Sequence, residues 1–129
     1  MKVFLLVMLA TCLLLGCKKE HVSAGLFGKW ELRKVYGGIA GFDSTYNAGN
    51  GRILQLGSDS TYTQFQGGKM SRQGTYQVTK QANVNGDGDS YISFDHNDYS
   101  QPLKLAGVTL TIGVDVTDQI ASQYQKLPD

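Results

Sequence analysis

The sequence is poor in the residues from which most catalytic and metal sites are built. It contains two cysteines and two histidines among 129 residues, and both cysteines, Cys12 and Cys17, lie near the N-terminus. It has no G-x-S-x-G motif, so no recognisable pattern joins a nucleophile to its base. No run of basic residues is present, which leaves no footprint for nucleic acid. These absences favour a binding or structural protein over an enzyme.

The N-terminus, by contrast, has the pattern of an export signal. Lys2 is followed by an almost unbroken apolar run over residues 3–15, which ends at Gly16-Cys17. A basic start, an apolar stretch of about 7–15 residues and a small residue at the cleavage point are typical of a secretory signal peptide. The run is shorter than the roughly 20 apolar residues that span a membrane. We therefore expect residues 1–16 to be removed from the mature protein.

The segment Leu14-Leu15-Gly16-Cys17 resembles the lipobox of bacterial lipoproteins. The resemblance implies that Cys17 receives a diacylglyceryl group and becomes a new, acylated N-terminus. More than one acyl chain is needed for stable anchoring, because a single chain binds a bilayer only marginally. Residues 17–25 are then a lipidated polar tether. A lysine directly after the cysteine, here Lys18, resembles the pattern of lipoproteins that are sent to the Gram-negative outer membrane. The expected location is therefore the outer membrane, on either its periplasmic or its surface face.

Cleavage and lipidation also remove both cysteines from redox or metal chemistry. Cys12 leaves with the signal peptide and Cys17 carries the lipid, so the remaining domain has neither a free thiol nor a disulfide. Loss of Lys2, with no acidic residue before Cys17, leaves as many basic as acidic residues. A neutral domain has no electrostatic footprint for nucleic acid or an anionic membrane surface. Membrane attachment is therefore expected to depend on the lipid.

Residues 26–129 have the pattern of a single all-β domain. Short runs of alternating apolar and polar residues are separated by turn-forming residues. The expected strands cover residues 29–36, 52–56, 61–66, 69–80, 91–95, 101–105, 108–114 and 121–127. Residues 37–50, rich in glycine and asparagine, are expected to be a long loop. Eight short antiparallel strands close most simply into an up-and-down barrel, whose interior is filled by side chains or holds one small ligand.

Gly28-Lys29-Trp30 opens the first expected strand, and Gly-x-Trp in this position is the most persistent motif of the lipocalins. The domain resembles the small lipocalin-like lipoproteins of Gram-negative bacteria also in GKWELRKVYGGIAG (28–41), DSTY (59–62), GTY (74–76) and YQKL (124–127). The resemblance implies a calycin-type barrel in which Leu26-Phe27 closes one end and Trp30 packs at the floor. It also implies that Lys126 lies over the indole ring. The domain is shorter than a full lipocalin and lacks its C-terminal helix and disulfide.

Two polar segments match metal sites in part. Residues 83–89 (NVNGDGD) place oxygen ligands at alternate positions, as the start of a calcium loop does, but Phe94 occupies the place of the bidentate glutamate. Asp95-His96-Asn97-Asp98 joins one imidazole to two carboxylates, but the domain offers no second histidine or cysteine to complete the site. We interpret both segments as polar turns and expect no metal and no cofactor.

Two hypotheses for the function remain open. In the first, the anchored barrel binds a small hydrophobic or amphipathic ligand, and its site is lined by apolar and aromatic side chains: Trp30, Leu32, Phe42, Leu54, Met70 and Tyr76. In the second, the barrel docks a protein of the cell envelope without a small-molecule ligand. Ile39, Phe42 and Tyr46 in the long loop would then form a contact patch, or a lid over the barrel mouth in the first case.

Overall fold

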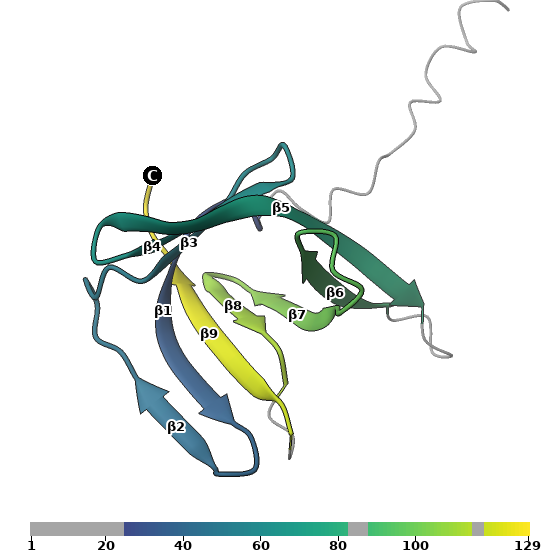
Figure 1. Ribbon diagram of the computed structural model, residues 1–129, viewed down its shortest axis with the longest axis horizontal. Coiled ribbons are helices and arrows are strands. Elements are labelled where there is room, and N and C mark those ends of the chain that lie inside the picture. Colours follow the sequence, from purple (N-terminus) through teal and green to yellow (C-terminus); the bar gives the residue numbers. More distant parts are fainter. Residues whose placement is uncertain (1–24, 83–87, 115–117) are drawn as a thin grey trace, which may run out of the picture.

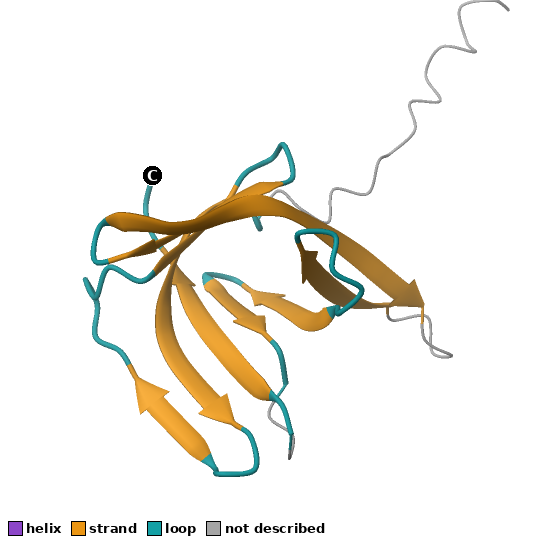
Figure 2. Ribbon diagram, viewed as in Figure 1, coloured by secondary structure: helices purple, strands orange, loops and turns teal. Residues whose placement is uncertain are grey.

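A computed structural model describes residues 25–82, 88–114 and 118–129 (Figure 1). The expected signal peptide, the lipobox with Cys17, and residues 83–87 of the calcium-like segment lie outside these ranges. The described residues form nine strands and no helix (Figure 2). The strands are β1 (Gly28–Gly37), β2 (Phe42–Thr45), β3 (Ile53–Leu56), β4 (Thr61–Gln66), β5 (Lys69–Ala82), β6 (Gly88–Phe94), β7 (Gln101–Ala106), β8 (Thr109–Ile112) and β9 (Ile120–Lys126).

The strands form one antiparallel sheet that closes on itself. In the described residues the order is β1-β3-β4-β5-β6-β7-β8-β9, and β9 returns to pair with β1 from Trp30↔Lys126 to Gly37↔Ile120. Closure gives the first and last strands a partner on each side, so neither is left as a free edge. The prediction of an all-β, eight-stranded antiparallel barrel is therefore confirmed, and each of the eight expected strands is present.

Strand β2 lies inside the segment that was expected to be a loop. Phe42–Thr45 pair with the second half of β1, whereas β3 pairs with its first half. Gly38 and Gly41, with φ angles of 80° and 62°, allow the tight turn between β1 and β2. β2 thus extends the sheet beside β1 (Figure 1) instead of forming a lid over the barrel mouth.

Two register shifts change which side chains face the barrel interior. The first shift lies where β1 pairs with β9. Leu32 pairs with Tyr124, but Lys34, two residues later, pairs with Gln123, which is only one residue from Tyr124. Because adjacent residues of a strand point to opposite faces, Lys34 is paired with a residue on the other face of β9 from Tyr124. Between β4 and β5 a similar shift separates Arg72 from Met70. An unbroken alternation would put Met70 inside. The shift places it outside instead, with 57% of its surface exposed.

The apolar core lies at the end of the barrel where β1 begins. Its fully buried side chains come from five strands: Trp30, Leu54, Leu56, Tyr62, Ile92 and Leu110. Burial of each large apolar side chain contributes about 1.5–3 kcal/mol. The indole N–H of Trp30 donates to the Leu26 carbonyl at 2.8 Å, which satisfies the one polar atom of this ring.

Lys126 closes this end from outside the core. Its Nζ lies 5.3 Å from the Trp30 ring centroid and donates to the Gly25 carbonyl at 2.9 Å. Leu26 is itself buried in the core cluster. The expected contact of Lys126 with Trp30 is thus confirmed, and the first described residues of the chain are fixed to the closed end.

Candidate functional site

The other part of the barrel interior is hollow. An inner cavity of about 210 Å³ is lined by residues of seven strands, β3 to β9. An outer cavity of about 190 Å³ adjoins it and shares Leu54, Gln64 and Tyr124 as lining residues. Small-molecule sites typically measure about 300–1,000 Å³. At about 210 Å³ the inner cavity lies below that range, so it suits only a very small ligand.

The lining of the inner cavity is part apolar and part polar. Its apolar wall contains Leu54, Phe94 and Ile112, and its polar groups are Gln64, Arg72, Gln101, Ser122 and Tyr124, with Tyr62 between the two. Neither the Gln64 nor the Gln101 carboxamide makes a hydrogen bond to another described residue. A carboxamide both donates and accepts hydrogen bonds. The cavity therefore offers free donors and acceptors opposite an apolar surface.

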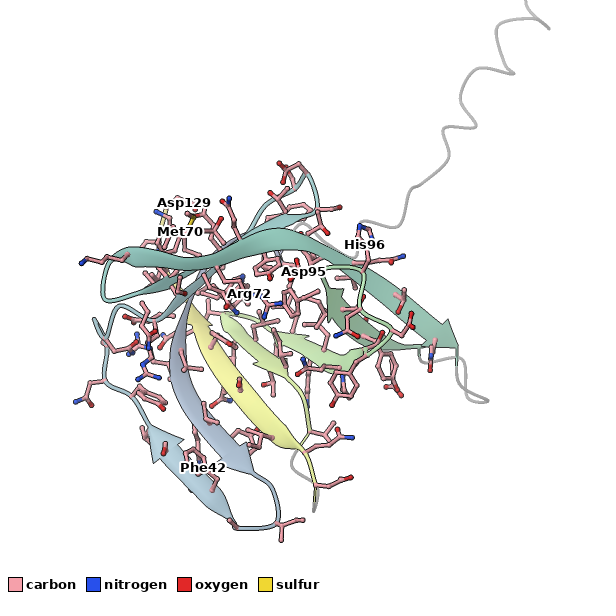
Figure 3. The ribbon with its side chains drawn as sticks, in the orientation of Figure 1. Phe42, Met70, Arg72, Asp95, His96 and Asp129 are labelled. Carbon is pink, nitrogen blue, oxygen red and sulfur yellow. The ribbon has the colours of Figure 1, made fainter. Side chains whose placement is uncertain are left out.

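Asp95, directly after β6, accepts hydrogen bonds from residues of β4 and β5, two of which line the inner cavity. Its Oδ2 accepts hydrogen bonds from the Tyr62 hydroxyl at 2.7 Å and from Arg72 Nη2 at 2.6 Å. Its Oδ1 accepts a hydrogen bond from the Thr75 backbone N–H at 3.2 Å. Figure 3 shows Arg72 and Asp95 close together on the side of β5 that faces the other strands, while Met70 lies on the opposite side.

These contacts fix the protonation states around the cavity. The hydrogen bond from Tyr62, followed by that from Arg72, lowers the pKa of Asp95 below its ordinary value, so the carboxylate is ionised at neutral pH. Burial raises the pKa of Tyr62, and the hydrogen bond to Asp95 raises it further. Burial also raises the pKa of Tyr124. Both phenols therefore remain protonated and able to donate at neutral pH.

Two local features of the chain place the Asp95 carboxylate. Asp95 and His96 have φ angles of 56° and 54°, a left-handed conformation that few non-glycine residues adopt. Their turn is closed by the Asn97 N–H, which donates to the Phe94 carbonyl at 3.1 Å. Opposite the turn, Gly74 has no side chain, and a Cβ there would overlap the Asp95 carboxylate. The carboxylate therefore packs directly against the backbone of β5.

The structure brings together only some of the residues that were predicted to bind a ligand. Leu54 lines both cavities and Leu32 lines the outer one. Trp30 and Tyr76 are buried in the core cluster, and the Tyr76 hydroxyl donates to the Gly57 carbonyl at 2.6 Å. The two remaining predicted residues are largely exposed and line neither cavity: Phe42 (48%) and Met70 (57%).

The polar lining residues were not predicted. Gln64, Gln101 and Ser122 were not among the residues predicted to bind a ligand, although each lines the inner cavity. Gln64 is two residues from the buried Tyr62, and this spacing is the one signal in the sequence that indicates its orientation. The partnership of Arg72 with Asp95 joins positions 23 residues apart and has no local signature.

A larger space, of about 850 Å³, lies on the β6–β7–β8 side of the barrel. It is lined by consecutive residues such as Ser90 and Tyr91, and Leu103 and Lys104. Neighbouring residues of a strand point to opposite faces, so this space lies across the rim of the sheet and not within the barrel. The same holds for the outer cavity, which Arg52, Ile53 and Leu54 line in succession. We therefore place the candidate site in the inner cavity, whose lining residues alternate along their strands.

Metal binding has no support in the described part of the chain. No group of three or more histidine, cysteine, aspartate or glutamate side chains is close enough there to hold an ion. Asp95, one of the three possible ligands in the segment 95–98, accepts hydrogen bonds from Tyr62, Arg72 and Thr75. In the same described ranges, no helix has the length and apolar character needed to cross a membrane.

Comparison with known proteins gives no relative for this chain. No protein-family model, curated protein or solved structure matches it.

Proposed function

We propose that the protein is a lipid-anchored barrel that binds one small amphipathic molecule in its interior. The observation that carries the proposal is the inner cavity, which seven strands enclose and in which free carboxamides face an apolar wall. Ligand sites are usually lined mostly by apolar groups, whereas this lining is mainly polar, which favours a small molecule rich in hydrogen-bonding groups. The lipocalin resemblance of the sequence supports the same role.

The polar lining supports ligand binding over a purely structural interior. Gln64 and Gln101 are only partly buried, and their carboxamides make no hydrogen bond to another described residue. They are therefore open to solvent or to a ligand that enters the inner cavity. At about 30 Å³ per water molecule in the liquid, the inner cavity of about 210 Å³ suits a compact ring compound and is too small for a long acyl chain.

Anchoring through Cys17 in an outer membrane is the second part of the proposal. The lipobox and the polar tether support it, and the first described residue, Gly25, lies at the closed end of the barrel beside Lys126. A flexible linker of eight residues, the number that separates Cys17 from Leu26, would reach roughly 16 Å. The closed end would then face the membrane. Replacing Cys17 with Ser should move the protein from the membrane fraction to the soluble fraction and abolish labelling by a palmitate analogue.

Native mass spectrometry of the protein extracted from its own host tests ligand binding. The wild-type barrel is expected to retain a small molecule. Ser122→Leu, which places a larger side chain in the inner cavity, is expected to lose it while remaining folded. Ser93→Leu is the matched control, because Ser93 follows the fully buried Ile92 and lies on the outer face of β6. A wild-type protein without any bound molecule, or equal retention by both variants, would contradict the proposal.

One observation favours a second candidate function, the docking of an envelope protein. Ile39, Phe42 and Ile120 are 84%, 48% and 50% exposed. Phe42 and Ile120 both pair with Gly37 from opposite sides, and Ile39 lies in the adjoining turn, so the three form one hairpin-tip patch. β1 has ten residues, which at about 3.3 Å per residue place the patch about 30 Å from the closed end. Exposed apolar clusters of this kind often mark protein contacts.

Photo-crosslinking in intact cells separates the two functions. A crosslinker at Ile39 is expected to capture a defined protein if the patch is a docking surface. The control position is Val108, which is also exposed (58%) but lies at the closed end. Equal products, or none, at the two positions would count against docking and leave ligand binding as the function.

A further inference from the structure

We propose that Asp95 makes the inner cavity selective for an uncharged ligand by neutralising Arg72. The inference rests on the ligand-binding function proposed above and adds the class of ligand. That class is a small, uncharged ring compound that carries hydrogen-bonding groups. Asp95 is on this view a specificity-determining residue, although it does not itself line the cavity.

Arg72 is the one charged residue among the described residues that line the inner cavity. A free guanidinium in such a place would attract carboxylates and phosphates, because its N–H groups match their oxygen atoms in geometry and charge. Here Nη2 already binds the Asp95 carboxylate at 2.6 Å. The adjacent opposite charges largely cancel at the distance of a ligand, so Arg72 offers its remaining N–H groups with little net attraction for an anion.

A second arginine borders the outer cavity but does not alter this balance. Arg52 lines the outer cavity and not the inner one. Its guanidinium lies over the Tyr46 ring, with 4.7 Å between the guanidinium carbon and the ring centroid, and the residue is exposed to solvent. Water and salt screen an exposed charge of this kind. The side chains of Arg72 and Asp95 are themselves 59% and 36% exposed, so solvent screens this pair as well. Arg72 differs from Arg52 in that it lines the inner cavity and is paired with a carboxylate.

The position of the Asp95 carboxylate is determined by several independent features. Tyr62, Arg72 and Thr75 donate hydrogen bonds to it. The left-handed turn at Asp95 and His96 directs it toward β5, and the missing side chain of Gly74 leaves room for it. An anionic ligand would have to compete with a carboxylate that three donors already hold. A neutral ligand meets no such competitor.

The other polar groups of the cavity also suit an uncharged partner. The carboxamides of Gln64 and Gln101 and the hydroxyl of Ser122 are neutral groups that both donate and accept hydrogen bonds. The Tyr62 and Phe94 rings pack edge to face, with centroids 4.8 Å apart, and form a rigid aromatic wall. A flat ring can contact this wall while its polar substituents reach the carboxamides.

Benzamide and benzoate form a suitable pair of probes, because they have nearly the same shape and differ in charge. Their affinities would be measured at neutral pH by NMR titration of the full-length chain in detergent, with the resonances of cavity residues as the readout. The wild-type protein is expected to bind benzamide at least about tenfold more tightly than benzoate, a difference of about 1.4 kcal/mol. Asp95→Asn keeps the shape of the side chain but frees the Arg72 charge, and should shift the ratio of affinities about tenfold or more toward benzoate.

Two further variants keep the test decisive. Asp98→Asn removes the same charge from an exposed position in the same turn and should leave the ratio unchanged. Arg72→Gln leaves the Asp95 charge unpaired and should weaken benzoate binding more than benzamide binding, even if Asp95→Asn does not fold. A folded Asp95→Asn protein with the wild-type ratio would overturn the inference but not ligand binding. If neither probe shifts the cavity resonances of any variant, the proposed ligand-binding function fails, and the inference fails with it.

Discussion

A cation lies over an aromatic ring both at the closed end of the barrel and beside the inner cavity, and the two regions use the same contact differently. Lys126 lies 5.3 Å from the Trp30 ring centroid and Arg72 lies 6.0 Å from that of Tyr62. Lys126 binds a backbone carbonyl and completes a packed apolar end. Arg72 binds the Asp95 carboxylate and borders a hollow, polar interior. The Lys126 cation over Trp30 thus completes the packed end of the barrel. The Arg72 cation over Tyr62 is paired with the Asp95 carboxylate, so its surroundings are polar with little net charge.

The two regions also differ in what they contribute: the packed end stabilises the fold, and the hollow part offers groups for binding. The region around Trp30 consists of apolar side chains that are almost fully buried, with no polar atom of the indole left without a partner. The region around Arg72 keeps free carboxamides and unfilled volume, and these do not stabilise a fold. Sites that serve a function are often less stable than the scaffold that holds them. Substitutions in the two regions should therefore have different consequences.

The largest effect is expected from Trp30→Ala. Removal of a fully buried tryptophan from the closed end should lower the free energy of unfolding by about 3–5 kcal/mol, as measured by urea denaturation. Phe42→Ala is the control, because Phe42 is an aromatic residue that is 48% exposed outside the barrel, and it should change stability by less than about 0.5 kcal/mol. Equal losses in the two variants would show that the closed end is not the source of stability.

Gly74→Ala should have the next largest effect. The new Cβ would overlap the Asp95 carboxylate and approach Tyr62, and overpacking of this kind destabilises by about 1–3 kcal/mol. The same substitution in an Asp95→Ala background should have a smaller effect, because the carboxylate is then absent. Denaturation of the single and double variants gives the coupling, and additive effects would show that Gly74 does not accommodate Asp95.

Lys126→Met should have a smaller effect, since it removes the cation over Trp30 and the bond to Gly25 but keeps an apolar side chain of similar length. A solvent-exposed cation over an aromatic ring contributes about 0.5–1 kcal/mol. Thermal unfolding of this variant would be compared with that of Lys29→Met, which removes a charge from an exposed position on β1. If both variants melt at the same temperature, the contact with Trp30 does not stabilise the closed end.

The smallest effect concerns the pH dependence of stability. The pKa of Asp95 is lower in the folded protein than the ordinary value of 3.8, because Tyr62 and Arg72 donate hydrogen bonds to its carboxylate. A group with a lowered folded pKa contributes stability that is complete above its unfolded pKa and is lost as the pH falls toward the folded value. Stability measured between about pH 5 and pH 2 should therefore fall less steeply for Asp95→Asn than for the wild type. Parallel curves would exclude a contribution from Asp95.

The sequence predicts the barrel well because each strand has a local signal. Alternation and turn residues locate the eight barrel strands, and the Gly-x-Trp motif locates the closed end. β2 was missed because its four residues, FDST, lack an alternating pattern and depend on the free half of β1 for pairing. Met70 was assigned to the interior because it alternates with Gly74 and Tyr76 along its own strand. The register shift that turns it outward arises from the pairing with Gln64 and Phe65 of β4, and the sequence of β5 alone does not show it.

The site was harder to predict than the fold for a related reason. Arg72, Asp95 and Tyr62 come from three separate segments and meet only after the barrel has closed. The turn 95–98 was correctly interpreted as polar, but its sequence does not show that Asp95 points back over Gly74. Polar residues inside a barrel resemble polar residues outside it, so Gln64 and Gln101 carry no local mark of their role.

The pairing of β1 with β9 has a consequence for when this protein can fold. Trp30 meets Lys126, so the contact that seals the sheet joins residues at the two ends of the domain. Such distant contacts slow folding, with closure in milliseconds to seconds for barrels of this kind. A chain still emerging from the ribosome lacks β9 and cannot complete the sheet. The topology itself thus delays folding until the last strand has been delivered.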